Sequence, residues 1–572
     1  ELDARQDVVA RRVRLPSVAP GWHRLEARCG DQVAFATVIA APDRVAQPVG
    51  RAWGWMLQLY AMRSERSWAV GEYADLRTLA ASAAADGAGL LLVNPLHAET
   101  PVLPLNPSPY SPSSRRFRSP LWLRVEDVPE YRSAGADLRA QVDGLKPINP
   151  PDRVDRDIAW AAKRAALELL WPVHRRGELA AWMATQGPAL QQFGVFCVLA
   201  ELHGPRWQEW PSGLRCPDSE DVAAACVAHA DRVAFFCWLQ LLVDEQLADV
   251  AGAASAMSIG IVHDLAVGVD VNGFDGWALQ DVLAMGIRVG APPDSFNQRG
   301  QDWGLPPWRP DKLREAGYAP FRDMLRAVLR HAGGLRLDHV MGLFRLWWLP
   351  AGGSPATGTY VDYDADAMLA VLALEASRAG AVVVGEDLGT VEDRVREALD
   401  ADGVLGSAVL WFQRDPAGPF LAPTAWRAGT LASVTTHDLP TAAGFLVEEH
   451  VRVRHELGQL GVTLDEERDR VRAERMALLD LLTATGLLAE HDNDPVLAMH
   501  ALLAASPSQL VLAAFGDAVG DLRQPNLPGT VDEYPNWRLP VADATGRPLT
   551  LDELLVHPGV RRLVAILSAR VR

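Results

Sequence analysis

Acidic residues recur at the ends of apolar runs along this chain, the pattern expected when several strands deliver side chains to one active site. Five runs end in titratable residues, namely His263 and Asp264, Asp338 and His339, Glu386 and Asp387, His437 and Asp438, and Asp517. A single acid after a strand often only caps the following helix. Acids on several different strands, most of them beside a histidine or a second acid, favour catalysis.

Asp338 has the sequence context of a nucleophile. In the run LRLDH it lies two residues after Arg336, so on a strand both side chains leave the same face. A guanidinium beside a carboxylate lowers its pKa by roughly 1–3 units and keeps it ionised, as a covalent nucleophile requires. The alternative is a structural ion pair in the interior.

Glu386 and Asp438 complete a set of three acids. Glu386 follows the apolar run AVVVG, where burial should raise its pKa and retain a proton for general acid catalysis. Carboxyl groups on neighbouring strands approach to about 5–5.5 Å, the spacing of a retaining glycosidase pair, whereas an inverting pair needs more room. Asp438, further along the chain, is expected to bind the transition state through sugar hydroxyls, with His437 donating to the same sugar.

The order of elements that must position these residues predicts a parallel (β/α)8 barrel within residues 48–572. Eight strand candidates, separated by amphipathic segments, cover residues 53–60, 89–96, 259–267, 334–342, 381–389, 407–413, 431–438 and 510–517. In such a barrel the active site lies at the C-terminal ends of the strands, where the acids fall. Large insertions with helical periodicity are expected at about 97–258, 283–333 and 439–509.

Residues 1–47 precede the barrel and are β-rich. The stretch GWHRLEARCGDQVAFATVIA alternates apolar and polar residues around Gly30 and Asp31, which predicts a β-hairpin. Because two strands alone do not make a stable domain, this segment is either the C-terminal part of a β-domain or an extension that packs on the barrel.

Composition excludes several functional classes. Lys and Arg number 55 against 72 Asp and Glu, a net charge of −17 over 572 residues that would repel nucleic acid and anionic lipid. No uncharged apolar run approaches the ~18 residues of a membrane span, so we expect an intracellular, cytoplasmic protein. The five cysteines include no CxxC pair and are expected to be reduced thiols without zinc.

Tryptophan is unusually frequent, with 19 Trp against 8 Tyr. Several fall in loops expected at the barrel rim, among them Trp303, Trp308, Trp347, Trp348 and Trp537. Indole faces are suited to stacking on sugar rings. Most of the tryptophans are nevertheless expected to belong to the hydrophobic core.

From about residue 50 to its end, the chain resembles the 4-α-glucanotransferases called amylomaltases or disproportionating enzymes, glycoside hydrolase family 77. The motifs that carry this resemblance occur in the family's order and are WGWMLQLYAMRSERSW, SPYSPSSRRF, APPDSFNQRGQDWGLPPW, LRLDHVMGLFRLWWLP, GEDLGT, SVTTHDLPT and QPNLPGTVDEYPNWR. Residues 1–47 resemble the tail of the N-terminal β-domain of actinobacterial-type members. VGEYADL, Gln413 and VEDRVRE depart slightly from the family pattern, which bears on fine specificity.

The resemblance implies transfer of a 4-α-glucan segment from one maltooligosaccharide to the 4-hydroxyl of another glucan or of glucose. It assigns Asp338 as the nucleophile that forms a covalent glycosyl intermediate, Glu386 as the acid/base and Asp438 as the transition-state stabiliser. It also implies no metal and no organic cofactor. The candidates for sugar contacts are Tyr110, Asp294, Trp303, Arg336, His437, Trp348 and Asn526.

Three alternatives stay open at the level of sequence. A retaining α-glucan hydrolase would use the same three carboxylates, because water and an acceptor hydroxyl compete for one intermediate. The His-Asp pairs could suggest a divalent-metal hydrolase, although the first strand lacks the HxH motif common in such barrels. A non-catalytic glucan-binding protein is disfavoured because all three acids are present.

Overall fold

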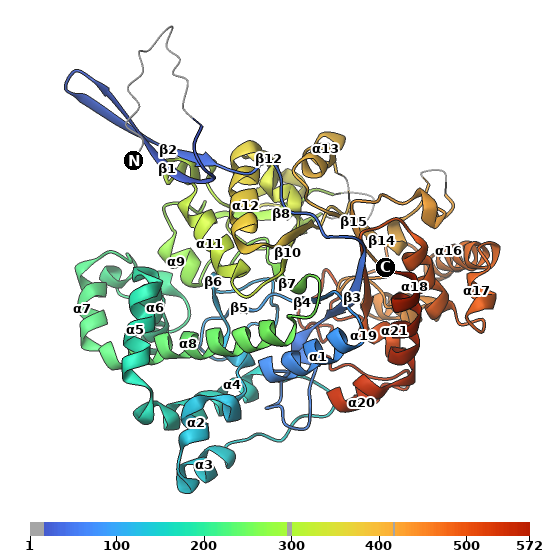
Figure 1. Cartoon of the computed structure of the whole chain (residues 1–572), viewed down its shortest axis with the longest axis horizontal. Coiled ribbons are helices and arrows are strands. Elements are labelled where there is room, and N and C mark those ends of the chain that lie inside the picture. The colour runs from blue at the N-terminus through green and yellow to red at the C-terminus, as the bar shows by residue number, and fades with distance from the viewer. Residues whose placement is uncertain (1–16, 294–299, 390, 416–417, 572) are drawn as a thin grey trace.

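The computed structural model describes residues 17–293, 300–389, 391–415 and 418–571. Its centre is a ring of parallel strands in the order β13-β10-β7-β4-β3-β16-β15-β14. The ring closes between β13 and β14, where the Leu405 N–H donates to Val383 O and the Gly385 N–H donates to Leu405 O. The predicted (β/α)8 barrel is therefore confirmed (Figure 1).

Each barrel strand overlaps one predicted run and is shorter than it. The bounds are β3 (Ala52–Leu57), β4 (Leu90–Val93), β7 (Gly260–Leu265), β10 (Gly334–Leu337), β13 (Val382–Gly385), β14 (Gly406–Val409), β15 (Thr430–Ser433) and β16 (Leu510–Ala514). Apolar side chains fill the barrel interior, among them Leu90, Val262, Val384, Leu431 and Leu512. Since side chains alternate along a strand, the residues two positions after Val262 and Val384 also face inward.

Helices surround the barrel and enclose two larger hydrophobic clusters between themselves and the strands. The helices that follow β3, β7, β10 and β13 are α1 (Tyr73–Ala85), α9 (Phe274–Ala278), α10 (Pro310–Glu315), α11 (Ala319–Leu329), α12 (Ala365–Ala379) and α13 (Asp393–Ala401). After β15 come α14 (Ala442–Leu446), α15 (Glu449–Glu456), α16 (Leu464–Ala484), α17 (Leu487–Glu490) and α18 (Pro495–Ala505). After β16 come α19 (Phe515–Val519), α20 (Leu551–Val556) and α21 (Pro558–Arg570).

The chain between β4 and β7 forms a large helical layer beside the barrel (Figure 1). It contains the short strands β5 (His97–Ala98) and β6 (Ser114–Arg118). Its helices are α2 (Pro129–Ser133), α3 (Ala136–Asp143), α4 (Arg156–Leu170), α5 (Arg176–Gln186), α6 (Pro188–His203), α7 (Glu220–Ala228) and α8 (Ala230–Ala253). A second, antiparallel sheet is built from segments that follow β7 and β10, namely β8 (Ile287–Ala291), β9 (Gln301–Asp302), β11 (Arg345–Pro350) and β12 (Thr359–Asp362).

A buried group of four charges fastens this layer to α1, and we call it the insertion cluster: Glu72, Asp75, Arg124 and Lys163. Lys163 Nζ lies 2.7 Å from Glu72 Oε1 and also donates to Leu121 O at 2.7 Å. Arg124 pairs with Glu72 and, at 2.9 Å, with Asp75. The four side chains are at most 3% exposed, so each charge depends on its partners for solvation.

The N-terminal hairpin consists of β1 (Gly21–Cys29) and β2 (Gln32–Ala40), which turn at Gly30 and Asp31. It projects from the body of the molecule (Figure 1), and its base is held where Trp22 Nε1 donates to Glu375 Oε1 at 2.7 Å. The strand positions nearer the turn are exposed, including the apolar side chains of Leu25, Val33 and Phe35.

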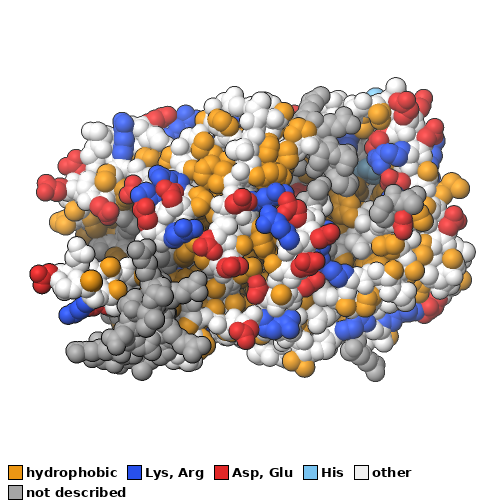
Figure 2. All heavy atoms as spheres, turned by 90° about the horizontal axis from the view of Figure 1, so that it is seen from above, with side chains coloured by type: hydrophobic (Ala, Val, Ile, Leu, Met, Phe, Trp, Pro, Cys, Tyr) orange, Lys and Arg blue, Asp and Glu red, His pale blue; other side chains and the backbone are white. Residues whose placement is uncertain are grey.

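On the face shown in Figure 2, acidic and basic side chains are interspersed and neither sign gathers into one broad patch. That face therefore lacks the basic footprint of a nucleic-acid interface. Within the described ranges, no single helix is long and apolar enough to cross a membrane. Only α7 and α8 together reach that length and composition, and they are bent by 84° relative to each other.

Candidate active site

Strand register brings the acids of β7, β10 and β13 side by side. Arg336 on β10 pairs with Asp264 on β7, and Leu337 pairs with Gly385 on β13. Asp338 and Glu386 each follow the last strand residue, so the carboxyl groups of two neighbouring strands emerge next to each other at the C-terminal mouth. Neighbouring strands lie about 4.8 Å apart, which suits a closely spaced pair of carboxylates.

Arg336 connects two of these acids. Its Nη1 lies 2.7 Å from Asp264 Oδ1 and 3.0 Å from Asp338 Oδ1. Asp264 is 4% exposed and Asp338 is 22% exposed, so one carboxylate is enclosed while the other still reaches the opening. Asp264 is a strand-end acid without a predicted role, and the sequence could not place it because strand register decides which residue faces Arg336.

A hydrogen-bond chain continues from Asp264 to the third acid. The Tyr110 hydroxyl donates to Asp264 Oδ2 at 2.7 Å and lies 3.2 Å from His437 Nδ1. His437 Nε2 lies 3.2 Å from Asp438 Oδ2, and Asn526 Nδ2 donates to Asp438 Oδ1 at 2.6 Å. Tyr110 comes from the layer after β4, whereas His437 and Asp438 follow β15, so distant segments of the chain meet at one mouth.

We call the connected charged residues the mouth network, and its members are Asp264, Arg336, Asp338, Glu386, His437 and Asp438. The His437 ring contacts both Tyr110 and Asp438. Because the Tyr110 hydroxyl donates its proton to Asp264, its oxygen accepts from His437 Nδ1, and Nε2 donates to Asp438. Both ring nitrogens therefore carry protons. Burial lowers the pKa of His437 but the Asp438 carboxylate raises it more, and the net change is upward.

Asp438 carries the opposite shift. Burial raises the pKa of its carboxyl, whereas His437 and the Asn526 amide lower it by more, so the net change is downward. The side chain is 43% exposed, which leaves it open to a ligand at the mouth. Asp438 is therefore held ionised by its neighbours while keeping solvent access.

Backbone groups hold Glu386 in place. Its Oε2 accepts from the His339 N–H at 3.0 Å and its Oε1 accepts from the Leu388 N–H at 2.8 Å. His339 has φ of +50°, a left-handed conformation that costs a side chain other than glycine about 1 kcal/mol or more. The strained turn directly after Asp338 thus points its N–H at Glu386. Gly385 faces Val340 of the same turn, where a Cβ would lie only 2.8 Å from a Val340 methyl.

The expected low pKa of Asp338 is wrong for this structure. Burial and the nearby carboxylates of Asp264 and Glu386 raise the pKa of Asp338 to about 6, although Arg336 pulls it down. The main reason is burial of the carboxyl, and Asp264 and Glu386 add to it; neither the depth of burial nor these neighbours can be inferred from spacing along one strand. Burial also raises the pKa of Glu386, as expected, and outweighs Arg336 and the two backbone N–H donors.

The remaining predicted contact residues differ in their placement. Trp303 lies edge-on to His339, with ring centroids 5.0 Å apart, and so borders the turn after Asp338. Trp348 on β11 packs against the hydrophobic cluster beneath the second sheet, and no described contact joins it to the acids. Asp294 lies outside the described residues.

Trp537 is a further residue of the mouth that received no specific role from the sequence. Its ring centroid lies 5.3 Å from that of Tyr110 and 5.2 Å from that of His437. Its backbone has φ of +61°, and Arg156 of α4 donates to its carbonyl at 2.6 Å. The long insertion therefore reaches over the barrel to support the wall beside His437.

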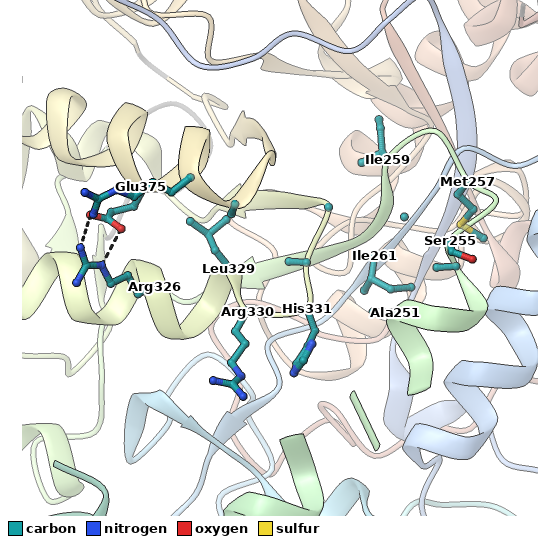
Figure 3. Close-up of a pocket in the computed structure, with 16 residues that line it drawn as sticks. Ala251, Ser255, Met257, Ile259, Ile261, Arg326, Leu329, Arg330, His331 and Glu375 are labelled. Atoms are coloured by element: carbon teal, nitrogen blue, oxygen red, sulfur yellow. Dashed lines mark hydrogen bonds and ion pairs between the residues drawn. The ribbon is translucent and has the colours of Figure 1, made fainter. Parts of the chain in front are cut away.

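Four residues of the mouth network line a small cavity, and a larger hollow lies elsewhere in the molecule. A cavity of about 50 Å³ beneath the mouth is lined by Asp264, Arg336, Glu386 and His437. A hollow of about 770 Å³ lies at the opposite end of β7 and β10, bordered by Ile259, Gly333 and the Arg326–Glu375 pair (Figure 3). Glu375, the carboxylate that lines it, pairs with Arg326 and Arg378, so cavity volume alone does not locate the chemistry here.

The geometry gives no support to a metal site at the His263–Asp264 pair. Asp264 faces into the barrel, whereas His263 points outward and its Nδ1 contacts Val328 O of α11 at 2.9 Å. Among the described residues, no group of three or more His, Cys, Asp or Glu side chains is arranged to hold a metal ion.

Known proteins are similar to this chain in sequence and in fold. A family profile described as 4-alpha-glucanotransferase matches residues 57–545. The 4-alpha-glucanotransferase of Mycobacterium tuberculosis H37Rv is 49% identical over 587 residues, which cover 98% of this chain and 80% of that protein. The Haemophilus influenzae 4-alpha-glucanotransferase is 34% identical over 91% of this chain and 80% of its own length. The crystal structure of Corynebacterium glutamicum amylomaltase matches with a TM-score of 0.87 and 37% identity, covering 96% of this chain and 80% of the other.

Proposed function

The chain belongs to the 4-alpha-glucanotransferase family, glycoside hydrolase family 77. We propose that it moves a 4-α-glucan segment from a donor maltooligosaccharide to the 4-hydroxyl of an acceptor by a double displacement on the mouth network. The observation that carries this proposal is the register that sets Asp338 beside Glu386, with Asp438 linked to them through Arg336, Asp264, Tyr110 and His437. These contacts support a site in which three carboxyl groups that follow different strands act on one sugar.

In the first step, the ionised Asp338 carboxylate attacks the anomeric carbon of the donor glucan. The glycosidic C–O bond breaks, and Glu386 gives its proton to the departing O4 oxygen. A glycosyl ester on Asp338 forms and the shortened glucan leaves. Asp438 accepts hydrogen bonds from ring hydroxyls that strengthen as positive charge develops on the sugar.

In the second step, the 4-hydroxyl of an acceptor glucan or glucose attacks the same carbon. Glu386 takes the hydroxyl proton, the ester bond to Asp338 breaks and the original anomeric configuration is restored. Water in the acceptor's place would make the enzyme a retaining hydrolase. Trp303 beside the Asp338 turn and the Pro- and Trp-rich segment around it supply walls that favour a sugar acceptor.

Product analysis from pure maltotriose distinguishes transfer from hydrolysis. Transfer yields glucose together with maltopentaose and longer chains, because each released segment is joined to another glucan. Asp338→Asn serves as the inactive control. Glucose and maltose without any elongated product would show that hydrolysis is the real reaction.

A trapping experiment tests the covalent step. Glu386→Gln should form the ester from an activated maltosyl fluoride, which needs no proton on its leaving group, and then turn over slowly. Mass spectrometry of a protease digest should find the added sugar on the peptide that contains Asp338. Sugar attached to a different carboxylate would reject the assigned nucleophile.

We propose that the reaction needs neither a metal nor an organic cofactor and that the partners are maltooligosaccharides and linear α-1,4-glucans. Activity that survives exhaustive chelation supports the first statement, and activity restored only by a divalent cation contradicts it. The cytoplasmic location expected from the sequence stays a prediction.

A further inference from the structure

Two buried titratable side chains behind the mouth face each other and take no part in the proposed chemistry. Asp517 of α19 and His500 of α18 are each completely buried, and Asp517 Oδ2 lies 3.8 Å from His500 Nε2. Neither of these two atoms has a hydrogen-bond partner within the described residues. Asp517 is also a strand-end acid in the sequence pattern, but it lies in α19 and its side chain turns toward Ala442 and His500.

The contacts of both residues fix where protons can sit. His500 Nδ1 lies 2.8 Å from Val496 O, a carbonyl that can only accept, so Nδ1 carries a proton and Nε2 of the neutral ring is an acceptor. An ionised Asp517 would set an acceptor against this acceptor. A protonated Oδ2 would instead turn an O–H toward Nε2, and the 3.8 Å between the two atoms would have to shorten for a hydrogen bond to form. Burial raises the pKa of Asp517 to about 7 and lowers that of His500 to about 4, which favours the proton on the acid.

The second oxygen of Asp517 reaches the loop that carries two residues of the mouth network. Asp517 Oδ1 accepts from the N–H of Ala442 at 2.7 Å, the first residue of α14. The adjacent Thr441 Oγ1 donates to Asp521 O at 2.6 Å. Residues 434–441 span from the end of β15 to this anchor and include His437 and Asp438.

The other end of the same loop is held by different groups. The Asn526 N–H donates to His437 O at 3.0 Å, and the Asn526 side chain donates to Asp438. Hydrogen bonds thus hold the loop at His437 and Asp438 through Asn526, and at Ala442 through Asp517. Loss of the bond to Ala442 would leave this end of the loop held by Thr441, and Asp438 itself by Asn526, His437 and Gln524.

We propose that Asp517 is a positioning residue for the reaction: as a neutral acid it turns one oxygen toward His500 and, with the other, anchors the loop that presents His437 and Asp438. The inference rests on the proposed role of Asp438 but names a residue that does not touch the sugar. The positioning role depends on the shape and hydrogen bonding of the Asp517 side chain and does not depend on a negative charge.

The test compares Asp517→Asn with Asp517→Ala in the full chain. Asparagine can accept from Ala442 with its oxygen and turn its amide toward His500, so kcat on maltotriose should stay within about threefold of wild type. Alanine removes the bond to Ala442, and a misplaced Asp438 should lower kcat by roughly 10- to 100-fold with a smaller change in KM. Asp517→Ser, which is too short to reach Ala442, replaces the alanine variant if that variant does not fold.

Two controls separate positioning from general stability. Glu130→Gln alters a buried acid in the layer after β4 and should change thermal stability without changing kcat. In a Glu386→Gln background, the infrared band of a protonated carboxylic acid should disappear when Asp517→Asn is added.

The proposal is overturned if Asp517→Asn loses as much kcat as Asp517→Ala, because the charge would then be required. It is also overturned if the alanine and serine variants keep wild-type kcat, or if no protonated-acid band is assigned to Asp517. If Asp438→Asn alone retained full activity, the proposed function would be wrong. The infrared comparison with Asp517→Asn would still show whether Asp517 is protonated.

Discussion

The insertion cluster and the mouth network are two buried groups of charged residues, and they differ in the balance of positive and negative charge. The insertion cluster pairs two acids with two bases, and its side chains are at most 3% exposed. The mouth network holds four acids against one arginine and one histidine, and it remains open at Asp338 and Asp438. The first group is closed and electrically balanced, whereas the second carries an excess of negative charge beside an opening.

This difference separates a structural cluster from a reactive one. Burying a charge is costly unless it is paired, so a cluster that serves stability alone should be balanced. Excess carboxylates raise one another's pKa, which retains a proton for acid catalysis and leaves negative charge to face a positively charged transition state. The hollow in Figure 3 is far larger but fits the same view, because its lining carboxylate, Glu375, pairs with two arginines and no excess of negative charge results.

The largest effect is expected from Asp338→Asn. Turnover should fall by roughly 10⁴-fold or more, as for removal of a covalent nucleophile. The thermal unfolding temperature at pH 7 should rise, because a buried carboxylate among other carboxylates opposes folding. The ordinary pKa of 3.8 is raised to about 6 in the folded protein, so the gain should be present above pH 6 and absent below pH 4. A lower unfolding temperature at pH 7 would contradict the contrast between the two clusters.

Glu386→Gln should lower kcat on maltotriose by roughly 10²- to 10⁴-fold, the usual contribution of general acid catalysis. The loss should be much smaller for formation of the ester from a maltosyl fluoride, because fluoride leaves without a proton. Single-turnover kinetics on both donors measures the difference. An equal loss on the two donors would remove Glu386 from the role of proton donor.

Lys163→Met tests the insertion cluster. Leaving Glu72 and Asp75 buried with one cation should cost about 3–5 kcal/mol in the free energy of unfolding. The kcat of the folded fraction should not change, because the cluster does not touch the mouth. Denaturant unfolding measures the first quantity and initial rates measure the second. Adding Glu72→Leu should recover part of the stability, and a large fall in kcat would mean that the two clusters are coupled.

The smallest effect is a pH dependence that belongs to the mouth network alone. Below pH about 6, kcat/KM should fall up to tenfold per unit because Asp338 becomes protonated and cannot attack. At higher pH the rate should fall again as Glu386 loses its proton. Because Asp338 and Glu386 interact, both limbs of the pH–rate profile reflect the pair rather than either residue alone. In Glu386→Gln, with a fluoride donor, the alkaline limb should vanish and the acid limb should move to lower pH. An unchanged acid limb would show that the two carboxylates do not interact.

Much of the fold was predictable because barrel strands leave a strong local signal. The short apolar runs and the amphipathic segments between them indicated all eight strands, although β10 and β15 end several residues earlier than the runs predict. The overlong runs include the turns that carry His339 and His437, whose backbone is fixed by contacts rather than by local propensity.

The sequence by itself determined the barrel, the strand ends on which the three acids fall and, by resemblance, the family. Only the tertiary structure decided that Arg336 faces Asp264 as well as Asp338, that Tyr110 and Trp537 close on His437, and that Asp517 turns away toward His500. Periodicity and motifs are properties of one segment and can be read along the chain. Shared ion pairs, pKa shifts and loop anchors depend on which segments pack together, and that information exists only once the ring of strands has closed.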